Sequence, residues 1–529
     1  MRIRLTILLI FIILLCFGTL FASSSSFVNT YTAPKWYVFI FCSVAIMVTF
    51  ALFNIFSDIK KLQPNNLVLP VCLIITILCT IQALYGIAQY MRLLPVFGRN
   101  RVTGSFDNPA GFAACLCAGF PFFFYFLSKR AIWIRCMSIA GMIIVGLAII
   151  ISGSRSGLLA LATVCVLGFF YLFQINKTQK IFIGILSAIL LSSLYFIKRD
   201  SADGRLLIWR CSWEMIKEKP VTGFGTGGFK ANYMNYQAKY FVEHPDSKYA
   251  MLADNIGHPF NEYIGLLVNY GFIGFLGFLL FSFILIRSFT RIKEKTLFTY
   301  IAAWCLTAIA IFALFSYPLR YPFVWVVGLL SCSVILFQGN EKAFKKFKAV
   351  KRFYVPALIL LLTLIICFKS YSRLMVDTKW CKTAHLSLEG RTEQMLPEYQ
   401  LLHAKLSNNE LFLYNYAAEL NYSKHYEESL SIARECESLW ADYDLQMLIA
   451  DDCQQIKDYP EAEQHYQKAK AMCPVKFVPL YKLFQLYEVT GEKENMRKIA
   501  ETIISKPVKI MSPTVNQIKK EVKQKMDCL

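Results

Sequence analysis

The sequence predicts an all-α protein, with a polytopic bundle of about eleven membrane-spanning helices followed by a soluble α-helical domain. Three observations lead to this fold class. The chain of 529 residues is 56% hydrophobic and 15% aromatic, and its apolar residues come in long continuous runs. Lysines and arginines gather in alternate loops between those runs, and a residue pattern recurs after 33 positions near the carboxyl terminus. Continuous rather than alternating apolar runs argue against a membrane β-barrel.

The expected spans are continuous apolar runs of the length that crosses a bilayer as a helix. They lie near residues 5–22, 36–57, 67–90, 109–127, 133–151, 157–174, 181–197, 259–286, 297–316, 322–337 and 353–370. The first run follows Arg2 and Arg4 and resembles a signal peptide. We interpret it as a signal anchor, because many spans follow and no A-x-A cleavage site is clear.

The positive-inside rule gives these spans an orientation. With a cytoplasmic amino terminus, the cytoplasmic loops carry Lys60, Lys61, Lys129, Arg130, Lys177, Lys180, Arg287, Arg291, Lys293, Lys295, Lys342, Lys345, Lys346, Lys348, Lys351 and Arg352. The short opposite loops carry Lys35, Arg92, Arg99, Arg101, Arg155 and Arg320. The alternation predicts an N-in, C-out topology. It divides the chain into spans 1–7 (1–197), a large outer loop (198–258), spans 8–11 (259–370) and an outer helical domain (371–529).

Charge and cysteine usage exclude some functions. The formal net charge of +21 is explained mainly by loop charges that orient the spans and attract anionic headgroups, so nucleic acid is not an expected partner. The 17 cysteines are spread through the chain without a C-x-x-C pair, which predicts neither a disulfide framework nor a zinc site. Asp442 and Asp444 form a D-x-D pattern in the helical domain, where a solvated turn between helices is expected.

The region after residue 371 contains a weak internal repeat. Residues 426–436 align with 459–469, and a further shift of 33 aligns Pro474 with Pro507. A degenerate unit lies near 378–403. Small or apolar residues at matching positions resemble tetratricopeptide repeats, whose helix pairs stack and leave a groove for a protein partner. A plain helical domain without a partner is the alternative.

The outer loop 198–258 contains two local features. Residues 206–219 have apolar side chains at helical spacing, which predicts an amphipathic helix on the membrane surface, with Arg205 at its start and Arg210 on a more polar side. The following GFGTGGF lacks both the third glycine and the preceding strand of a dinucleotide fingerprint. A tight turn against the membrane face is therefore expected.

The polar residues predicted on the outer face are rich in arginine and poor in paired carboxylates. Candidate ligands of an anionic substrate are Arg101, Asn108, Arg155, Arg205, Arg210, His258, Asn261, Glu262 and Arg320. The arginine fork suits phosphate oxygens. A lipid diphosphate neutralised by arginines needs no metal, and His258 or Glu262 is a candidate base. Alternatively, Arg155 is a snorkelling anchor, His258 is structural, and Glu262 complements a helix dipole.

Five stretches in this order resemble the O-antigen ligase family, which includes O-antigen polymerases and protein O-oligosaccharyltransferases. They are TGSFDNPAGFAA (103–114), SGSRSGLLAL (152–161), GRLLIW (204–209), PVTGFGTGGF (220–229) and HPFNEYIGLLVNYGFIG (258–274). The resemblance implies an inner-membrane enzyme that transfers a glycan from undecaprenyl diphosphate on the periplasmic face, without a metal or cofactor.

The resemblance also implies roles for individual residues. The family's loop arginines correspond to Arg205 and Arg210, and its H-x-H-N motif corresponds to 258–261, with Phe260 in place of the histidine before Asn261. Either His258 takes the catalytic role, or Glu262 or Arg205 carries more of it. The diphosphate and glycan would contact Arg101, Asn108, Arg155, Arg210, Asn261 and Arg320.

The acceptor is left open by the sequence: lipid A–core for a lipopolysaccharide ligase, another repeat unit for a polysaccharide polymerase, or a protein hydroxyl. Two non-enzymatic alternatives are a transporter of lipid-linked glycan and a membrane anchor that displays a repeat scaffold. The transporter predicts charges deep in several spans, whereas most arginines here lie in outer loops. The scaffold predicts that Arg205 and His258 can be replaced without loss of function.

Overall fold

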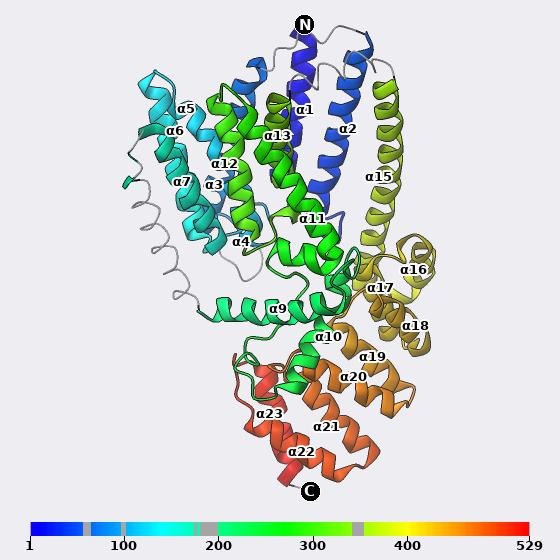
Figure 1. Cartoon of the computed structure of the whole chain (residues 1–529). Coiled ribbons are helices and arrows are strands. Elements are labelled where there is room, and N and C mark those ends of the chain that lie inside the picture. Colours follow the sequence, from blue (N-terminus) through cyan, green and yellow to red (C-terminus); the bar gives the residue numbers. More distant parts are fainter. Residues whose placement is uncertain are drawn as a thin grey trace. The chain divides into compact units, whose positions relative to one another are not determined.

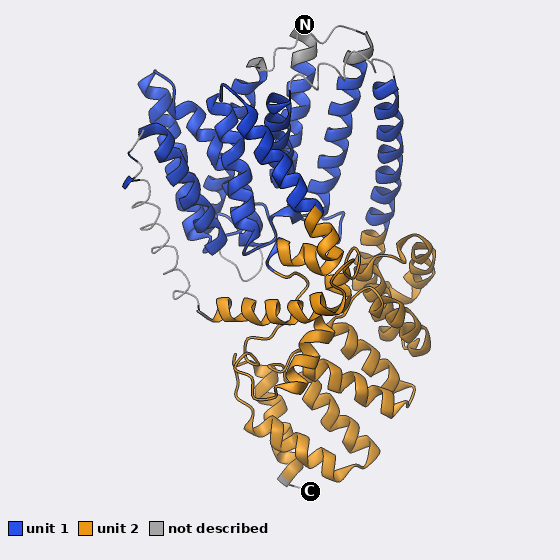
Figure 2. Cartoon of the chain, viewed as in Figure 1, with its two compact units in different colours: residues 1–194, 260–262, 277–379 blue, residues 195–259, 263–276, 380–529 orange. Residues whose placement is uncertain are grey.

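The computed structural model describes residues 2–56, 65–96, 102–173, 199–340 and 354–527, together with residues 176, 178 and 179. Within those residues the regular elements are helices, and no strand is found (Figure 1). The chain forms two compact units (Figure 2). Unit 1 comprises residues 1–194, 260–262 and 277–379, and unit 2 comprises 195–259, 263–276 and 380–529. The outer loop is thus grouped with the carboxyl-terminal helices.

Unit 1 is built from long apolar helices. They are α1 (Arg2–Phe21), α2 (Ala33–Phe56), α3 (Asn65–Tyr90), α4 (Pro109–Gly119), α5 (Phe123–Leu127), α6 (Ile132–Ile151), α7 (Arg155–Phe173), α11 (Glu262–Arg291), α12 (Leu297–Ala313), α13 (Pro322–Gly339) and α15 (Tyr354–Leu386). Two short 3₁₀ turns, η2 (Phe120–Phe122) and η3 (Pro318–Arg320), join α4 to α5 and precede α13. Helices α11 and α15 also extend into unit 2.

The predicted span 109–127 is divided into α4, η2 and α5, and each of the other predicted spans outside 181–197 overlaps one of these helices. The span 181–197 lies outside the described residues. Among the described residues, eight helices are long and apolar enough to cross a membrane, while α1 and α12 contribute shorter apolar stretches. These helices support a multi-pass membrane protein. The number of spans and their orientation stay predictions.

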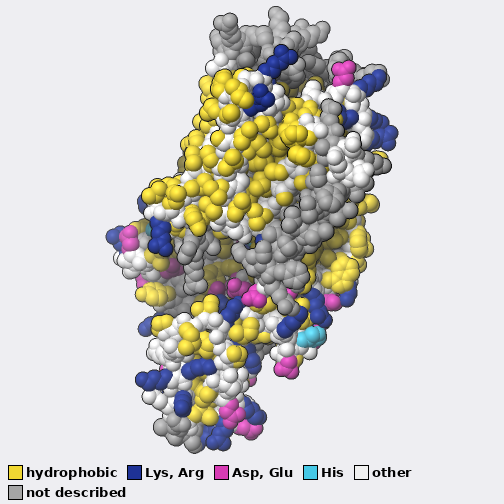
Figure 3. All heavy atoms as spheres, turned by 90° about the vertical axis from the view of Figure 1, so that its left-hand side faces the viewer, with side chains coloured by type: hydrophobic (Ala, Val, Ile, Leu, Met, Phe, Trp, Pro, Cys, Tyr) yellow, Lys and Arg dark blue, Asp and Glu magenta, His cyan; other side chains and the backbone are white. Residues whose placement is uncertain are grey.

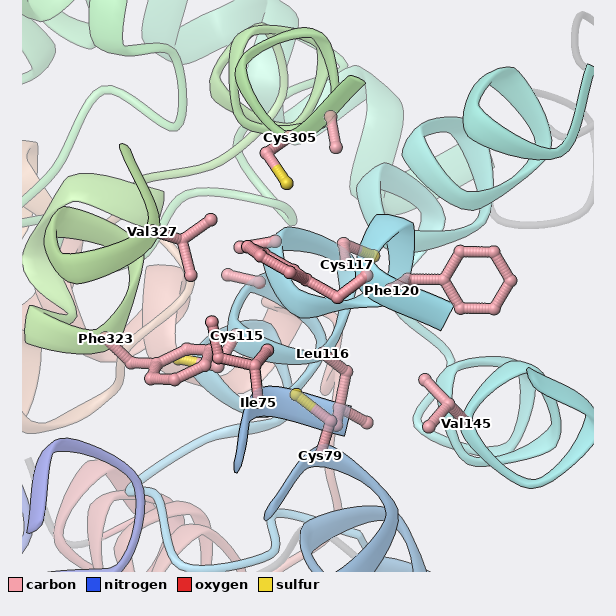
Figure 4. Packing of buried hydrophobic residues seen from close by; sticks show 14 of the residues in the cluster. Ile75, Cys79, Cys115, Leu116, Cys117, Phe120, Val145, Cys305, Phe323 and Val327 are labelled. Carbon is pink, nitrogen blue, oxygen red and sulfur yellow. The ribbon is translucent and has the colours of Figure 1, made fainter. Parts of the chain in front are cut away.

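The core of unit 1 surrounds α4. Phe112, Cys115 and Leu116 of this helix are fully buried. They belong to one cluster with side chains of α3, α6, α12 and α13 (Figure 4). Cysteines from four helices, including Cys79 and Cys305, lie in this cluster as small apolar side chains.

The outer surface of the unit 1 helices is apolar. Ile143 of α6 is 64% exposed and Phe283 of α11 is 56% exposed. Figure 3 shows hydrophobic side chains gathered over the upper part of the molecule in that view, with few charged side chains among them. A surface of this kind is stable in contact with lipid chains rather than with water.

Unit 2 begins with α9 (Arg199–Glu218) and α10 (Gly228–Glu243), followed by an irregular segment that leads to His258. Its carboxyl-terminal part contains α16 (Thr392–Leu406), α17 (Glu410–Tyr422), α18 (Tyr426–Glu437), α19 (Tyr443–Gln455), α20 (Tyr459–Met472), α21 (Val478–Thr490), α22 (Lys493–Ser505) and α23 (Pro513–Asp527). Consecutive helices pack as pairs.

The helix pairs follow the predicted period. Helices α18, α20 and α22 begin 33 and 34 residues apart, and the aligned residues Ser429 and Ala462 are both fully buried. The tetratricopeptide assignment itself stays a prediction. Helix α15 runs unbroken to Leu386, so the predicted boundary at residue 371 falls inside a helix.

Candidate functional site

Two arginines of the predicted site, Arg205 and Arg210, lie on α9. Arg205 is partly exposed and Arg210 is exposed on the same helix. The indole N–H of Trp209, on the intervening turn, donates to the carbonyl oxygen of Pro259 at 3.0 Å. This bond fixes α9 to the residue that follows His258. Unit 2 therefore brings the segment of Arg205 and Arg210 to the segment of His258.

The apolar face of α9 is covered by protein and is not available to lipid, while the position of the helix at the membrane surface stays a prediction. Leu207, Cys211 and Met215 are buried, and α9 packs against α10. The guanidinium of Arg210 lies 5.1 Å from the centre of the Tyr240 ring of α10, in a cation–π arrangement. The packing orients α9 by protein contacts on one side, while Trp213 remains 52% exposed.

The glycine-rich turn docks on α11 through backbone hydrogen bonds. The N–H groups of Phe224 and Gly225 donate to the carbonyls of Val268 and Asn269 at 2.9 and 2.8 Å. In the opposite direction, the N–H of Phe272 donates to the carbonyl of Pro220 at 2.8 Å. The Asn269 side chain also accepts from the N–H of Phe229 at 2.9 Å. The expected tight turn is present, and it packs against residues 268–273 of the chain itself.

Two glycines make this close approach possible. Gly271 interrupts α11 with φ +59° and ψ −161°, a conformation that is almost restricted to glycine. A Cβ there would lie 2.3 Å from the carbonyl oxygen of Val221. At Gly223, φ is +67° and a Cβ would lie 2.5 Å from the backbone of Asn269. The stretches 220–229 and 258–274 are thus two sides of one backbone junction.

In unit 1, the loop before α4 carries a second polar cluster. Asn108 is the N-cap of α4, because its Oδ1 accepts from the N–H of Gly111 at 2.9 Å. Its Nδ2 donates to the Tyr321 hydroxyl at 2.8 Å. The neighbouring Asp107 forms an ion pair with Arg320 at 3.2 Å. The capping bond therefore gives Asn108 a structural role, and Arg320 already has a carboxylate partner.

The first residues of α11 reach the same cluster. Glu262 Oε1 accepts from the N–H of Leu319 at 3.1 Å, which ties α11 to η3. Phe260 has φ +51°, an uncommon conformation for a bulky residue, and its ring packs edge-on against Tyr317 at 5.3 Å. Phe260 thus makes an aromatic contact to Tyr317, the residue before η3. The strain at Phe260 marks this position as functional or tightly constrained.

Sequence analysis missed the groups that hold this cluster. Asp107 lay within one of the family-like stretches but was not selected. Lys35, expected only as a loop charge, is fully buried and donates to the carbonyls of Ala22 and Ser105 at 2.6 and 2.9 Å. Gln89 of α3 accepts from the N–H groups of Thr103 and Gly104 at 3.0 and 2.7 Å. A polar residue inside or beside an apolar run was the available signal.

The predicted site residues are divided between the units. Asn108, Asn261, Glu262, Arg320 and Arg155, the first residue of α7, belong to unit 1. Arg205, Arg210 and His258 belong to unit 2. The structure brings Asn108 and Arg320 together through Asp107, and Glu262 to η3. Arg101 lies outside the described residues. Across the part of the chain that is described, no group of three or more His, Cys, Asp or Glu is arranged to hold a metal ion.

Comparison with known proteins finds a similarity in the same region of the chain. No curated protein matches the sequence. A family model described as O-antigen ligase matches residues 140–279. The matched part contains α7, α9, the glycine-rich turn and the His258–Gly274 stretch, whereas the 103–114 stretch lies outside it. The match supports a membrane glycosyltransferase or ligase of the O-antigen ligase family.

Proposed function

We propose that the protein transfers a glycan from a polyprenyl diphosphate, such as undecaprenyl diphosphate, to an acceptor hydroxyl at the periplasmic face of a bacterial inner membrane. The proposal rests on a set of hydrogen-bonded segments of unit 2 that all lie within residues 140–279, the part matched by the family model. There, the arginine helix α9, the glycine-rich turn and the segment of His258 are joined by Trp209–Pro259 and by the 220–229 to 268–273 backbone bonds.

The chemistry follows from these side chains. The acceptor oxygen attacks the anomeric carbon, the bond from that carbon to the diphosphate oxygen breaks, and the lipid diphosphate leaves with the bonding electrons. Arg205 and Arg210 offset the negative charge on the leaving group. His258 accepts the acceptor proton as general base. In this scheme the arginines supply the positive charge that a metal ion provides in other reactions with a diphosphate leaving group.

The contacts of Glu262 and Arg320 favour supporting roles. Glu262 is engaged by the Leu319 N–H and Arg320 by Asp107. We therefore assign Glu262 and Arg320 to shaping the ends of α11 and α13, and His258 rather than Glu262 to proton transfer. Arg155, at the start of α7, remains a candidate ligand for the donor.

The test uses the full-length protein in lipid nanodiscs, a glycan-linked undecaprenyl diphosphate, and candidate acceptors of three kinds: lipid A–core, the glycan itself and a protein. We expect release of undecaprenyl diphosphate that depends on one acceptor. Arg205→Ala should lower the rate about 100-fold or more, and His258→Ala by about 100-fold or more.

Lys217→Ala is the matched control, because Lys217 is an exposed cation on the same helix whose partner is Glu214 at 2.9 Å. This variant should transfer glycan at the wild-type rate. Full activity of both Arg205→Ala and His258→Ala, with every acceptor tested, would exclude the proposed catalytic roles. The acceptor that supports turnover distinguishes a ligase from a polymerase or a protein oligosaccharyltransferase.

A further inference from the structure

Helix α10 of the outer loop is embedded in the carboxyl-terminal helical domain. It packs against α20, and Phe229, Tyr233, Met234 and Phe241 are buried along its length. The N–H of Ala441, just before α19, donates to the carbonyl of Lys230 at 3.1 Å. The loop and the helical domain therefore share a core within unit 2.

Gln237 joins three segments of this core. Its side chain is fully buried. Its Nε2 donates to the carbonyls of Asp254 at 3.0 Å and of Met472, the last residue of α20, at 2.7 Å. Its Oε1 accepts from the Tyr233 hydroxyl at 2.8 Å. Because both amide hydrogens and the oxygen are used, the residue holds the 254 segment to the end of α20 with a defined geometry.

A second bond holds the next residue of that segment. Asn255 Nδ2 donates to Asp442 Oδ2 at 2.7 Å. The other oxygen of Asp442 caps α19 by accepting from the N–H groups of Asp444 and Leu445 at 2.8 and 3.1 Å. The D-x-D pattern starts in the turn between α18 and α19 and Asp444 is exposed, as expected, but Asp442 is only 2% exposed and is therefore not solvated. One oxygen of the Asp442 carboxylate therefore binds the helical domain and the other binds the outer loop.

These bonds act on the segment that carries His258. Asn255 precedes His258 by three residues, and Pro259, directly after it, is held by Trp209 of α9. The segment is thus fixed on one side to the helical domain and on the other to the arginine helix. A misplacement of about 1 Å at a reacting group costs about 100-fold in rate.

We propose that Asn255 and Asp442, with Gln237, are positioning residues through which the carboxyl-terminal helical domain sets the place of His258 relative to α9. The domain is then an internal part of the transfer site, and this surface of α19 and α20 serves the chain's own loop. The proposal rests on the proposed function for its catalytic consequence, and on the contacts alone for its structural one.

The test exchanges the hydrogen-bond donor and acceptor of the Asn255–Asp442 pair. Asn255→Asp sets two carboxylates against each other and should lower kcat for glycan transfer about 10- to 100-fold with a smaller change in KM for the donor. The double variant Asn255→Asp with Asp442→Asn restores a donor facing an acceptor and keeps the α19 cap, since asparagine caps as well as aspartate. It should recover kcat to within about threefold.

The matched control is Asn421→Asp. Asn421 makes the same kind of bond, from its Nδ2 to Asp452 Oδ1 of α19 at 2.8 Å, but it does not contact the outer loop. This variant should leave kcat unchanged. Loss of activity in both single variants to a similar extent, or failure of the double variant to recover, would show that the domain contributes stability only.

A readout independent of activity separates this proposal from the proposed function. Hydrogen–deuterium exchange of the full-length protein should rise in residues 251–259 in Asn255→Asp, return to wild type in the double variant, and stay unchanged there in Asn421→Asp. Unchanged exchange in Asn255→Asp overturns the positioning role. Absence of transfer by the wild-type protein, with the expected exchange pattern, overturns only the proposed function.

Discussion

The predicted site residues of the two units are held in different ways. In unit 1, Asn108, Glu262 and Arg320 are bound to the ends of neighbouring helices, and their polar atoms contact Gly111, Leu319 and Asp107. In unit 2, the contacts of α9 and of the His258 segment run through α10 to helices that lie about 200 residues later in the chain.

This difference indicates how well each unit tolerates amino-acid substitutions. The unit 1 cluster consists of caps and one ion pair on apolar helices whose packing is extensive, so loss of one contact leaves the helices in place. The unit 2 segment is irregular, and its position depends on a few side-chain and backbone bonds. We therefore expect substitutions at the unit 2 junction to affect glycan transfer more than comparable substitutions in the unit 1 cluster.

The largest effect is expected for Gly271→Ala. Alanine cannot adopt φ +59°, ψ −161° without strain, and its Cβ would overlap the carbonyl oxygen of Val221. We expect a loss of at least about 2 kcal/mol in the free energy of unfolding, with transfer lost as the glycine-rich turn moves. Gly277→Ala, six residues later on the same helix and facing open space, should be neutral. Thermal unfolding and transfer assays of both variants test this, and a neutral Gly271→Ala would contradict it.

The sequence predicted the local features and missed the long-range ones. The apolar runs predicted the helices of unit 1, because the length and hydropathy of a segment can be read from that segment alone. The 33-residue offset gave the helix pairs near Ser429 and Ala462. The partners of the glycine-rich turn, of Asn255 and of Asp107 are set by tertiary packing between distant segments, which a single sequence does not encode in any periodicity.

The second prediction concerns a buried carboxyl inside the helical domain. Asp452 is fully buried. Its Oδ2 lies 2.6 Å from Ser429 Oγ, which also lies 2.8 Å from the carbonyl of Ala417. The Ser429 hydroxyl donates to the Asp452 carboxylate; when Asp452 is protonated it can donate to Ser429 instead, which leaves the hydroxyl hydrogen for the Ala417 carbonyl. Burial, with a contribution from Asp451, raises the pKa of Asp452 to about 6.

The sign of the pH effect follows from this raised pKa. The stabilisation by protonated Asp452 is complete below the ordinary aspartate pKa of about 3.9 and is lost as pH rises through 6, a change of about 3 kcal/mol. Asp452→Asn imitates the protonated form and should be more stable than wild type at pH 7.5, with the difference vanishing near pH 4. The charged and titratable groups that act with Asp452 are Asp451, whose own partner is Lys482, and Tyr466.

Thermal unfolding and hydrogen exchange of α17–α19 across this pH range measure the effect. Asp451→Asn is the control: it relieves the repulsion with Asp452 but also loses the 2.9 Å pair with Lys482, so it should stabilise the domain less than Asp452→Asn does. If Asp452→Asn is less stable than wild type at pH 7.5, the ionised carboxylate itself stabilises the domain, and the expected sign of the pH effect is wrong.

A smaller effect is expected in the unit 1 cluster. Asp107→Ala leaves Arg320 without this carboxylate, and both side chains are about two-thirds or more buried. We expect a loss of about 1–2 kcal/mol and a modest decrease in transfer. The double variant Asp107→Ala with Arg320→Ala should be less destabilised than the sum of the single variants. Additive losses would show that the pair does not couple, and loss of transfer without loss of stability would move Arg320 to the donor site.

The smallest effect is expected for Lys230→Met, which tests whether every link between α10 and the helical domain matters equally. Lys230 Nζ pairs with Glu410 at 2.5 Å and lies 5.1 Å from the Trp440 ring, but both charged side chains are about a third exposed. Methionine keeps the aliphatic stem and the backbone bond from Ala441 to Lys230. We expect a loss of at most about 1 kcal/mol that shrinks in high salt, with kcat within twofold of wild type. If Lys230→Met lowers kcat as strongly as Asn255→Asp, then His258 depends on the docking of α10 as a whole rather than on the bonds to residues 254 and 255.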